Sequence, residues 1–432
     1  MLSNSKIDKI GRILSKPEQY SEEEVQESYE LLNQYRMDHL EPLTELNKKL
    51  REWLVDFSKD YYIAQRLKRT PRILEKMRRL KNMRLSQLQD VGGCRIIVEN
   101  YQIQEELYKY IIHKLTKSKT ITIDLNKKNN PVDYRERGRD DSGYRAIHII
   151  VKVRGVKIEI QIRSSMQHYW AESIERTSII YQKNLKSLQG DPIVIQYFKI
   201  LSDIFFEIEC NRTPTISQKK DLDELKIKAE NIIKNSDSYN VLYSNVNENF
   251  IQHMKSRVGA KSQKRYCKIY NWLLIFNWKT GEFQNWSLLE NNTPKYIAEE
   301  YEKFERMYSV DSGYEVVVIG ASSVETIRHT HSHYFGLQNY DKVLDGFDDT
   351  LISFQRRKKI NPTCRLILCK LVTNRKWGKS TVTLDTIKNH YCKDKMDVVE
   401  SLEKLVCEQL VVQHNHVYSL NSSKNDEINS LI

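Results

Sequence analysis

The sequence predicts an α+β protein: a mixed sheet flanked by helices, followed by a small α/β domain and a winged-helix-like module. Three observations lead to this fold class. Residues 143–163 read as an apolar β-hairpin, a basic helical segment precedes it, and three helical segments and a second hairpin lie near the C-terminus. We expect a helical lead-in over 1–30, a first domain over 31–212, a second over 213–350 and a third over 360–421.

The hairpin of residues 143–163 is organised by its turn. If Arg154 and Gly155 form a two-residue turn, each apolar side chain on the first strand faces an apolar partner on the second. These pairs are Val153/Val156, Val151/Ile158, Ile149/Ile160 and Ile147/Ile162. The opposite face then carries His148, Ile150, Lys152, Lys157, Glu159, Gln161 and Arg163. That face is either a solvated surface or the wall of a site.

Composition limits the class of partner and the compartment. The 432 residues carry a formal net charge of +12, which suits an anionic partner, either nucleotide or nucleic acid. The seven cysteines are scattered, without a C-x-x-C pair, and this favours a reducing compartment. No apolar run approaches the ~20 residues of a membrane span, and the first residues lack an apolar signal segment. We therefore expect a cytoplasmic protein without a membrane partner.

The segment from Arg66 to Arg84 holds nine basic residues and one acid, Glu75. A solvated helix face usually mixes basic and acidic residues, and this segment does not. We still expect most of these side chains to face solvent, but the excess of positive charge indicates that Arg66, Lys68 and Lys76 face a polyphosphate. Pro71 starts the helix that contains Lys76.

Asp90 stands just before a buried strand, and Gly92 and Gly93 permit close backbone approach there. Taken alone, an acid at this place most often forms a turn. Together with Glu159 it becomes half of a candidate Mg²⁺ site, because Mg²⁺ takes one or two carboxylates and fills its other positions with water and substrate phosphates.

Several separated motifs, in order, resemble the RelA/SpoT nucleotidyltransferase domain over about residues 30–210. They are R-x-K at Arg66 and Lys68, D-x-x-x-x-R at Asp90 and Arg95, G-Y-R-x-I-H at 143–148, E-I-Q-I-R at 159–163 and Q-H-x-W-A-E at 167–172. The resemblance implies a synthetase-only member, since no His-Asp pair of the family's hydrolase domain is found. Such an enzyme transfers the β,γ-pyrophosphate of ATP to the 3′-hydroxyl of GDP or GTP, in guanosine tetraphosphate metabolism and the stringent response.

The resemblance also implies roles, carried over by motif. Asp90 and Glu159 would be catalytic and bind Mg²⁺, and Tyr144 would stack on the guanine of the acceptor. The ATP-binding residues would be Arg66, Lys68, Lys76 and Arg95. The acceptor site would be lined by His148, Gln161, Arg163 and, as the nearest substitute in the preceding loop, Arg139.

Two departures from the family pattern concern Gln65 and the acceptor loop. The family often has Gly before R-x-K, where this chain has Gln65. The loop before Gly143 reads RERGRDDS, without the usual Pro-Lys pair. The acceptor is therefore open: the alternatives are the 3′ end of tRNA, modified by a growth-arresting toxin, and no acceptor at all, in an inactive nucleotide sensor. The resemblance also leaves a homo-oligomer open.

The C-terminal half shows patterns of structure and no motif of chemistry. A connecting helix is expected over 219–235, a hairpin turning at 279–281, and a strand followed by a helix capped by Ser322 or Ser323. Three histidines in this helix, at 329, 331 and 333, do not share a helical face, and we expect them on the surface.

Residues 360–421 predict three helices and a hairpin turning at 414–415, typical of a winged helix. The third helix is acidic, so protein contact or regulation is favoured over DNA reading, with a protein or a nucleic acid as the partner. We expect the last residues, from 422 on, to be loose.

Overall fold

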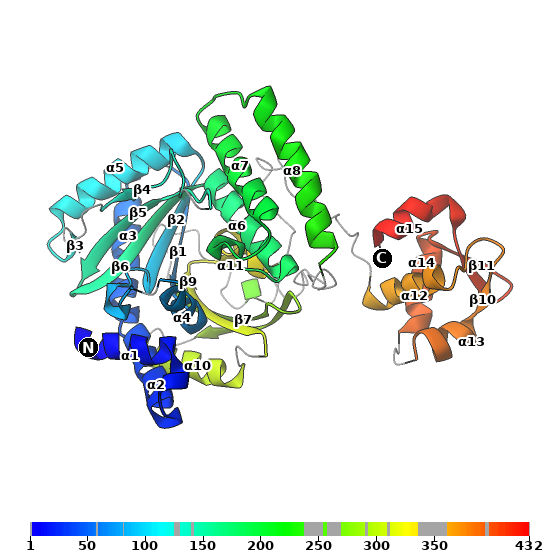
Figure 1. Cartoon of the computed structure of the whole chain (residues 1–432), viewed down its shortest axis with the longest axis horizontal. Helices are drawn as coiled ribbons and strands as arrows, with labels where there is room; N and C mark the ends of the chain where they lie inside the picture. The colour runs from blue at the N-terminus through cyan, green and yellow to red at the C-terminus, as the bar shows by residue number, and fades with distance from the viewer. Residues whose placement is uncertain are drawn as a thin grey trace. The chain divides into compact units, whose positions relative to one another are not determined.

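The computed structural model describes residues 2–57, 59–80, 82–124, 130–139, 142–236, 254–256, 269–289, 293–308, 312–335, 361–393 and 397–431 (Figure 1). The chain divides into two compact units, Met1–Leu351 and Ile352–Ile432. The first unit contains the site described below.

Three helices open the first unit: α1 (Asn4–Ser15), α2 (Glu22–Met37) and α3 (Leu40–Leu54). Helix α2 has the predicted cap, Ser21, whose side chain accepts from the backbone of Glu24. The helix runs through the boundary expected at residue 30. Helix α1 and helix α4 (Thr70–Arg79) share an apolar cluster around Ile10, Leu14 and Ile73, so the lead-in packs as part of the unit.

The first unit is built on one nine-stranded sheet with the order β3-β5-β6-β2-β1-β9-β7-β8, and β4 also pairs with β5. The strands are β1 (Tyr61–Leu67), β2 (Gly92–Val98), β3 (Ile121–Ile123), β4 (Val132–Asp133), β5 (Ile147–Val153), β6 (Val156–Ser164), β7 (Tyr270–Asn277), β8 (Glu282–Leu289) and β9 (Tyr314–Ala321). Strands β2 and β6 are parallel and the other pairs are antiparallel, so the sheet is mixed as expected.

The predicted hairpin is confirmed residue by residue. Strands β5 and β6 pair Val153 with Val156 and continue in register to Ile147 opposite Ile162. Arg154 and Gly155 both have positive φ, 51° and 80°, which matches the twist of a two-residue hairpin turn. The register puts His148 beside Gln161 and Ile150 beside Glu159, as the alternation predicts.

The two faces of the sheet have different coverings (Figure 1). Helix α3 and helix α5 (Tyr101–Lys117) pack Leu46, Leu50, Leu107 and Ile111 on one face, in a common core with the inward residues of β5 and β6. The other face carries the polar residues of β5 and β6. Helix α6 (Ser165–Tyr181), which is capped by Ser164 as predicted, follows β6 directly and contacts β2 and β6. Helices α7 (Pro192–Glu209) and α8 (Ile216–Lys234) follow it.

The region expected as a separate small α/β domain, residues 213–350, is not separate. Its strands β7, β8 and β9 form as predicted, but β9 pairs with β1 and extends the sheet of the first domain. Helix α10 (Pro294–Met307) and helix α11 (Val324–Thr330) complete this extension, and α11 has the expected cap, Ser323.

Gln65, the departure from the family's glycine, lies at the junction of β1 and β9. It pairs with Gly320, and a Cβ on Gly320 would come within 2.6 Å of the Gln65 side chain. Gln65 is only 2% exposed, so it has no room to move away. The Gln65 side chain is thus accommodated by a glycine on the neighbouring strand β9.

The second unit contains the three expected helices and the expected hairpin, in the expected order. They are α12 (Pro362–Thr373), α13 (Leu384–Thr386) extended by a π-helical turn over Ile387–Tyr391, α14 (Val398–Cys407), β11 (Val411–His414) and β12 (Val417–Leu420). The turn is at Asn415 and His416, one residue later than predicted, and a short strand β10 (Val382–Thr383) adds to the sheet.

The tail predicted to be loose is ordered. Residues Asn425–Leu431 form helix α15, which buries Ile428 and Leu431 against α12 and α14 in the core of the second unit. Among the parts of the chain that the structure describes, no helix has the length and apolar character that a membrane crossing requires.

Candidate active site

All eleven site residues predicted from the sequence line one cavity of about 410 Å³. The sheet register explains why they meet. Arg66 on β1 lies opposite Gly93 on β2, Gly93 lies opposite Glu159 on β6, and Arg95 lies opposite Gln161. Directly paired residues point to the same face, so β1, β2, β6 and β5 present the polar face to one space. The residues are Arg66, Lys68, Lys76, Asp90, Arg95, Arg139, Tyr144, His148, Glu159, Gln161 and Arg163.

Asp90 is held between two lysines. The Lys68 ammonium pairs with Asp90, and Lys76 Nζ lies 3.1 Å from each of its carboxylate oxygens. Burial opposes ionisation of Asp90, but the two ammonium groups outweigh it and lower the pKa of the carboxyl far below its usual range. Two cations predicted to bind ATP therefore share one anion.

Glu159 begins a chain of hydrogen bonds across β6 and β5. Its Oε1 lies 2.8 Å from His148 Nδ1, and His148 Nε2 lies 2.8 Å from the Tyr144 hydroxyl. Arg163 donates to that hydroxyl at 3.1 Å. Burial alone would lower the pKa of His148, but the charge of Glu159 and its hydrogen bond raise it to about 9. Glu159 and His148 thus form an ion pair at neutral pH.

The two carboxylates fit a divalent cation. Burial raises the pKa of Glu159, but the charge of His148 and its hydrogen bond lower it, and the pKa is lowered overall. The charge of Asp90 acts on Glu159 across the cavity in the opposite direction and raises this pKa. Two ionised carboxylates that repel each other across one space suit a hard cation. Among the described residues no group of three or more His, Cys, Asp or Glu side chains forms a metal site.

Arg163 keeps unused donors inside the protein. It is 3% exposed, and its Nε and Nη1 have no hydrogen-bond partner among the described residues. Buried N–H groups are nearly always paired, so an anionic ligand is the natural partner for these two. The Arg163 guanidinium also lies 5.0 Å from the centre of the Tyr144 ring.

Tyr144, which the resemblance assigns to stacking on a base, is largely buried. It is 8% exposed, and the guanidinium of Arg139 lies 5.8 Å from its ring centre, in addition to that of Arg163. A base that stacks on Tyr144 has to share its ring with these cations. Asp140 and Asp141, in the altered loop, lie outside the described residues.

The solvated-face interpretation of the basic segment is wrong for two arginines. Arg69 and Arg72 also line the cavity, Arg69 pairs with Glu315 of β9, and Arg72 Nη1 lies 2.8 Å from Glu75. Arg78 and Arg84 are exposed as predicted. The amphipathic pattern of α4 indicates which residues of the helix are buried. It does not reveal that β9 contacts Arg69, the residue just before the helix.

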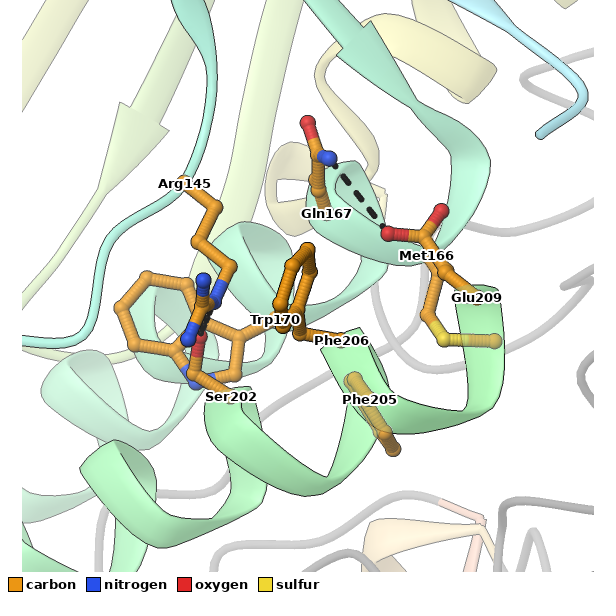
Figure 2. A pocket seen from close by; sticks show the side chains of 8 residues that line it. All are labelled: Arg145, Met166, Gln167, Trp170, Ser202, Phe205, Phe206 and Glu209. Atoms are coloured by element: carbon orange, nitrogen blue, oxygen red, sulfur yellow. Dashed lines mark hydrogen bonds between the residues drawn. The ribbon is translucent and has the colours of Figure 1, made fainter. Parts of the chain in front are cut away.

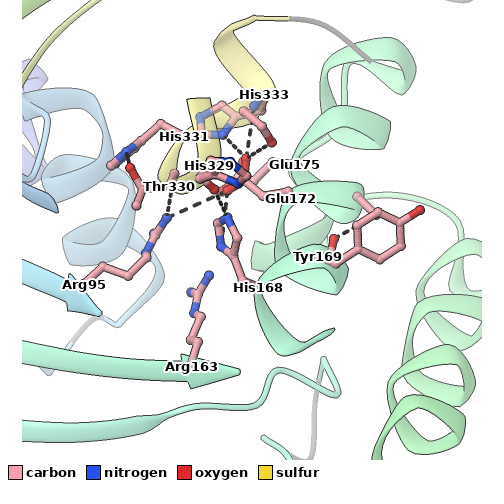
Figure 3. A network of polar contacts seen from close by, with 12 residues as sticks. Arg95, Arg163, His168, Tyr169, Glu172, Glu175, His329, Thr330, His331 and His333 are labelled. Carbon is pink, nitrogen blue, oxygen red and sulfur yellow. Dashed lines mark hydrogen bonds and ion pairs between the residues drawn. The ribbon is translucent and has the colours of Figure 1, made fainter. Parts of the chain in front are cut away.

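The prediction of surface histidines is also wrong. His331 and His333 are 1% and 6% exposed, and their segment packs on α6 (Figure 3). Glu172, the last residue of the Q-H-x-W-A-E motif, accepts from Ser332 Oγ at 2.9 Å, from the His333 backbone at 3.0 Å and from His333 Nδ1 at 2.8 Å. The motif's acid therefore anchors the added segment.

The same segment holds a predicted ATP-binding residue. Arg95 Nη1 donates to the Thr330 carbonyl at 2.6 Å (Figure 3). Arg95 Nε donates to Gln161 at 3.1 Å. Burial and the nearby guanidiniums of Arg163 and Arg66 lower the pKa of Arg95 to about 9. Arg95 is thus fixed from two sides, by β6 and by the end of α11.

Two other cavities suit a polyphosphate less well. One of about 700 Å³ borders α2, α4 and α10 and is lined by several glutamates, among them Glu302, Glu305 and Glu315. The other, of about 10 Å³, lies between α6 and α7 (Figure 2) and is at the lower limit for one water. Glu209 lines it and accepts from Gln167, and burial raises the pKa of Glu209 to about 7.

Comparison with known proteins agrees with the motifs. Residues 65–186 match the family described as a region found in RelA / SpoT proteins. The resemblance drawn from the motifs is therefore confirmed for this segment.

The similar proteins cover only part of this chain. Uncharacterised proteins of Mycobacterium bovis and Mycobacterium tuberculosis are 25% identical over 124 residues, which is 29% of this chain and 42% of each relative. The chain thus spans less than half the length of these relatives. Among solved structures, small alarmone synthetase 1 of Bacillus subtilis bound to its product pppGpp is 25% identical over 39% of this chain and 88% of its own, with a TM-score of 0.32.

A GTP pyrophosphokinase family protein of Streptococcus pneumoniae is 24% identical and covers 43% of this chain and 92% of its own, with a TM-score of 0.29.

Proposed function

We propose that this protein is an ATP-dependent pyrophosphokinase that transfers the β,γ-pyrophosphate of ATP to the 3′-hydroxyl of GDP or GTP. The observation that carries the proposal is the single cavity in which Asp90, paired with two lysines, and Glu159, paired with His148, stand on a RelA/SpoT region. Its volume of about 410 Å³ lies within the range of small-molecule sites.

The charges support transfer of a polyphosphate. Such reactions depend mostly on positioning and on neutralising charge. Lys68 and Lys76 would exchange Asp90 for the phosphates of ATP, and Asp90 and Glu159 would then hold Mg²⁺. When bound, Mg²⁺ would neutralise charge on the phosphate oxygens.

The acceptor side would be the wall formed by Glu159, His148, Tyr144 and Arg163. The two unpartnered nitrogens of Arg163 suit a phosphate of the acceptor. Glu159 is a candidate to receive the proton of the 3′-hydroxyl. The hydroxyl oxygen forms a bond to the β-phosphorus, the bond from that phosphorus to the α-phosphate oxygen breaks, and AMP leaves.

The test is transfer from γ-³²P-labelled ATP with Mg²⁺, in separate reactions with GDP, GTP and deacylated tRNA. We expect label on GDP or GTP. Glu159→Gln should reduce transfer at least a hundredfold, since it removes a metal ligand and the partner of His148. The matched control is Glu45→Gln, which removes a carboxylate that pairs with Arg154 at the hairpin turn, outside the cavity.

The other outcomes separate the alternatives. Label on tRNA alone would keep the chemistry and make the protein a tRNA-modifying toxin. Nucleotide binding without transfer to any acceptor would favour the inactive sensor. Full activity of the Glu159→Gln protein would contradict the proposed site.

A further inference from the structure

His331 lines the cavity and has an unused hydrogen-bond acceptor. It lines the cavity beside Arg66 and Arg95 and is 1% exposed. Its Nδ1 lies 2.9 Å from Thr330 Oγ1, and that hydroxyl donates its only proton to the Thr326 carbonyl at 2.7 Å. Thr330 Oγ1 must therefore accept from His331, which places the proton of the imidazole on Nδ1. His331 Nε2 then carries a lone pair, and it has no partner among the described residues.

The surroundings keep this imidazole neutral. Burial, and after it the positive charges of Arg95 and Arg66, lower the pKa of His331 well below its usual range. The same two cations disfavour a metal ion at Nε2. The group that completes the hydrogen bond must therefore bring its own N–H or O–H.

His331 lies on the side of the cavity where Arg95 is held. The Thr330 carbonyl binds Arg95, and Arg95 pairs with Ala64 on β1. Lys68 follows Ala64 by four residues. At about 3.3 Å per residue in a strand, this places their Cα atoms about 13 Å apart. If the phosphates of ATP bind at Lys68, the nucleoside reaches the position of His331.

We propose that His331 Nε2 accepts a hydrogen bond from the 6-amino group of the donor's adenine and so selects ATP over purines that lack this donor. Phosphate oxygens carry no proton at neutral pH and cannot satisfy Nε2. The 6-amino group of adenine carries two protons and can donate one of them to Nε2. A 6-oxo purine has an oxygen at this position, and that oxygen would face the lone pair of Nε2 unfavourably. The segment added to the RelA/SpoT region thus contributes a specificity residue to the donor site.

This inference rests on the proposed function, because it takes ATP as the donor, and binding tests it without transfer. Calorimetry would measure the Kd of the full chain for three ligands: ATP, purine riboside triphosphate, which has hydrogen in place of the amino group, and 2′-deoxy-ATP. We expect the loss of the amino group to weaken binding about fivefold to tenfold, the value of one neutral hydrogen bond. We expect 2′-deoxy-ATP to bind like ATP.

Three variants assign the effect to His331. His331→Phe removes the acceptor and should bind ATP and the riboside triphosphate equally. His331→Gln offers an amide oxygen near the same place and should restore part of the preference. His329→Phe is the matched control, because His329 stacks on Tyr62 and does not line the cavity. Thermal unfolding of each variant identifies any loss of fold, and the comparison of ligands on the unchanged protein does not depend on the variants.

Three results would overturn the assignment, and the first two concern the preference for ATP over the riboside triphosphate. One is equal binding of ATP and the riboside triphosphate by the unchanged protein, and the other is a preference that survives in His331→Phe. A loss confined to 2′-deoxy-ATP would also overturn it, since the contact would then be to the ribose. Failure of the proposed function would look different: adenine preference at His331 would remain, and no acceptor would gain label.

Discussion

His148 and Glu159 form a buried ion pair in the wall of the cavity, with Nδ1 and Oε1 2.8 Å apart. Its effect on stability depends on pH. A histidine whose pKa is raised on folding stabilises the protein fully below its unfolded value of about 6.5. That contribution is lost as pH rises through the folded value, which is about 9 here.

We therefore expect the free energy of unfolding to fall by about 1–3 kcal/mol between pH 6.5 and 9 because of this pair. Glu159→Gln should remove this part of the pH dependence, whereas Glu45→Gln should keep it. Urea unfolding at several pH values measures the effect. Identical pH profiles for Glu159→Gln and the unchanged protein would show that Glu159 does not hold the proton on His148.

At the scale of single residues, the sequence predicts many of the side chains that line the cavity. Period-two alternation around Gly155 determines which residues of β5 and β6 share a face, and the RelA/SpoT motifs supply Asp90, Arg66 and Lys68. His148, Glu159, Gln161 and Arg163 on that face line one cavity together with these three residues, although their roles stay predictions. His331 and His333 could not be placed, because their burial comes from Glu172, about 160 positions earlier in the chain, and no local pattern reports such a contact.

Strand β9 decides how the elements are assembled, because it pairs with β1 and brings α11 to the cavity. The strand itself is evident from its run of valines and isoleucine. Its neighbour is not, since an apolar strand pairs equally well with any free edge. The sequence does hold one signal: Gln65 stands where the RelA/SpoT pattern often has glycine, and a glycine, Gly320, lies opposite it.

Gly320→Ala should destabilise the protein by about 1–3 kcal/mol, the usual effect of overpacking a filled interior. The added Cβ would lie 2.6 Å from Gln65 Cγ. Gln65→Ala should remove most of this penalty, so the double variant should be more stable than the sum of the single effects predicts. Additive effects in denaturant unfolding would contradict the pairing of β1 with β9.

On the scale of the whole molecule the chain has two units, where the sequence suggested three successive domains after a lead-in. The second unit has its own core, around Leu368, Leu402 and Leu420. The first unit has a core to which β7 and β9 contribute Leu273, Ile275, Val316 and Val318. Domain boundaries follow shared cores, and composition alone does not show which apolar strands share one.

Truncation tests this division. A chain that ends at residue 351 should keep the stability of the first unit, because the second unit has a separate core. A chain that ends at residue 236 should unfold or aggregate, since it loses β7–β9 and leaves β1 as an open edge. Thermal unfolding and size-exclusion chromatography compare the two. A stable, monomeric 1–236 protein would support the original three-domain interpretation.

The most direct measurement of the central claim is the balance of products from unlabelled ATP and GDP or GTP with Mg²⁺, followed by ³¹P NMR. The account predicts AMP and a 3′-pyrophosphorylated acceptor in equal amounts, both absent with Glu159→Gln. AMP with free pyrophosphate, or ADP with a singly phosphorylated acceptor, would contradict pyrophosphate transfer.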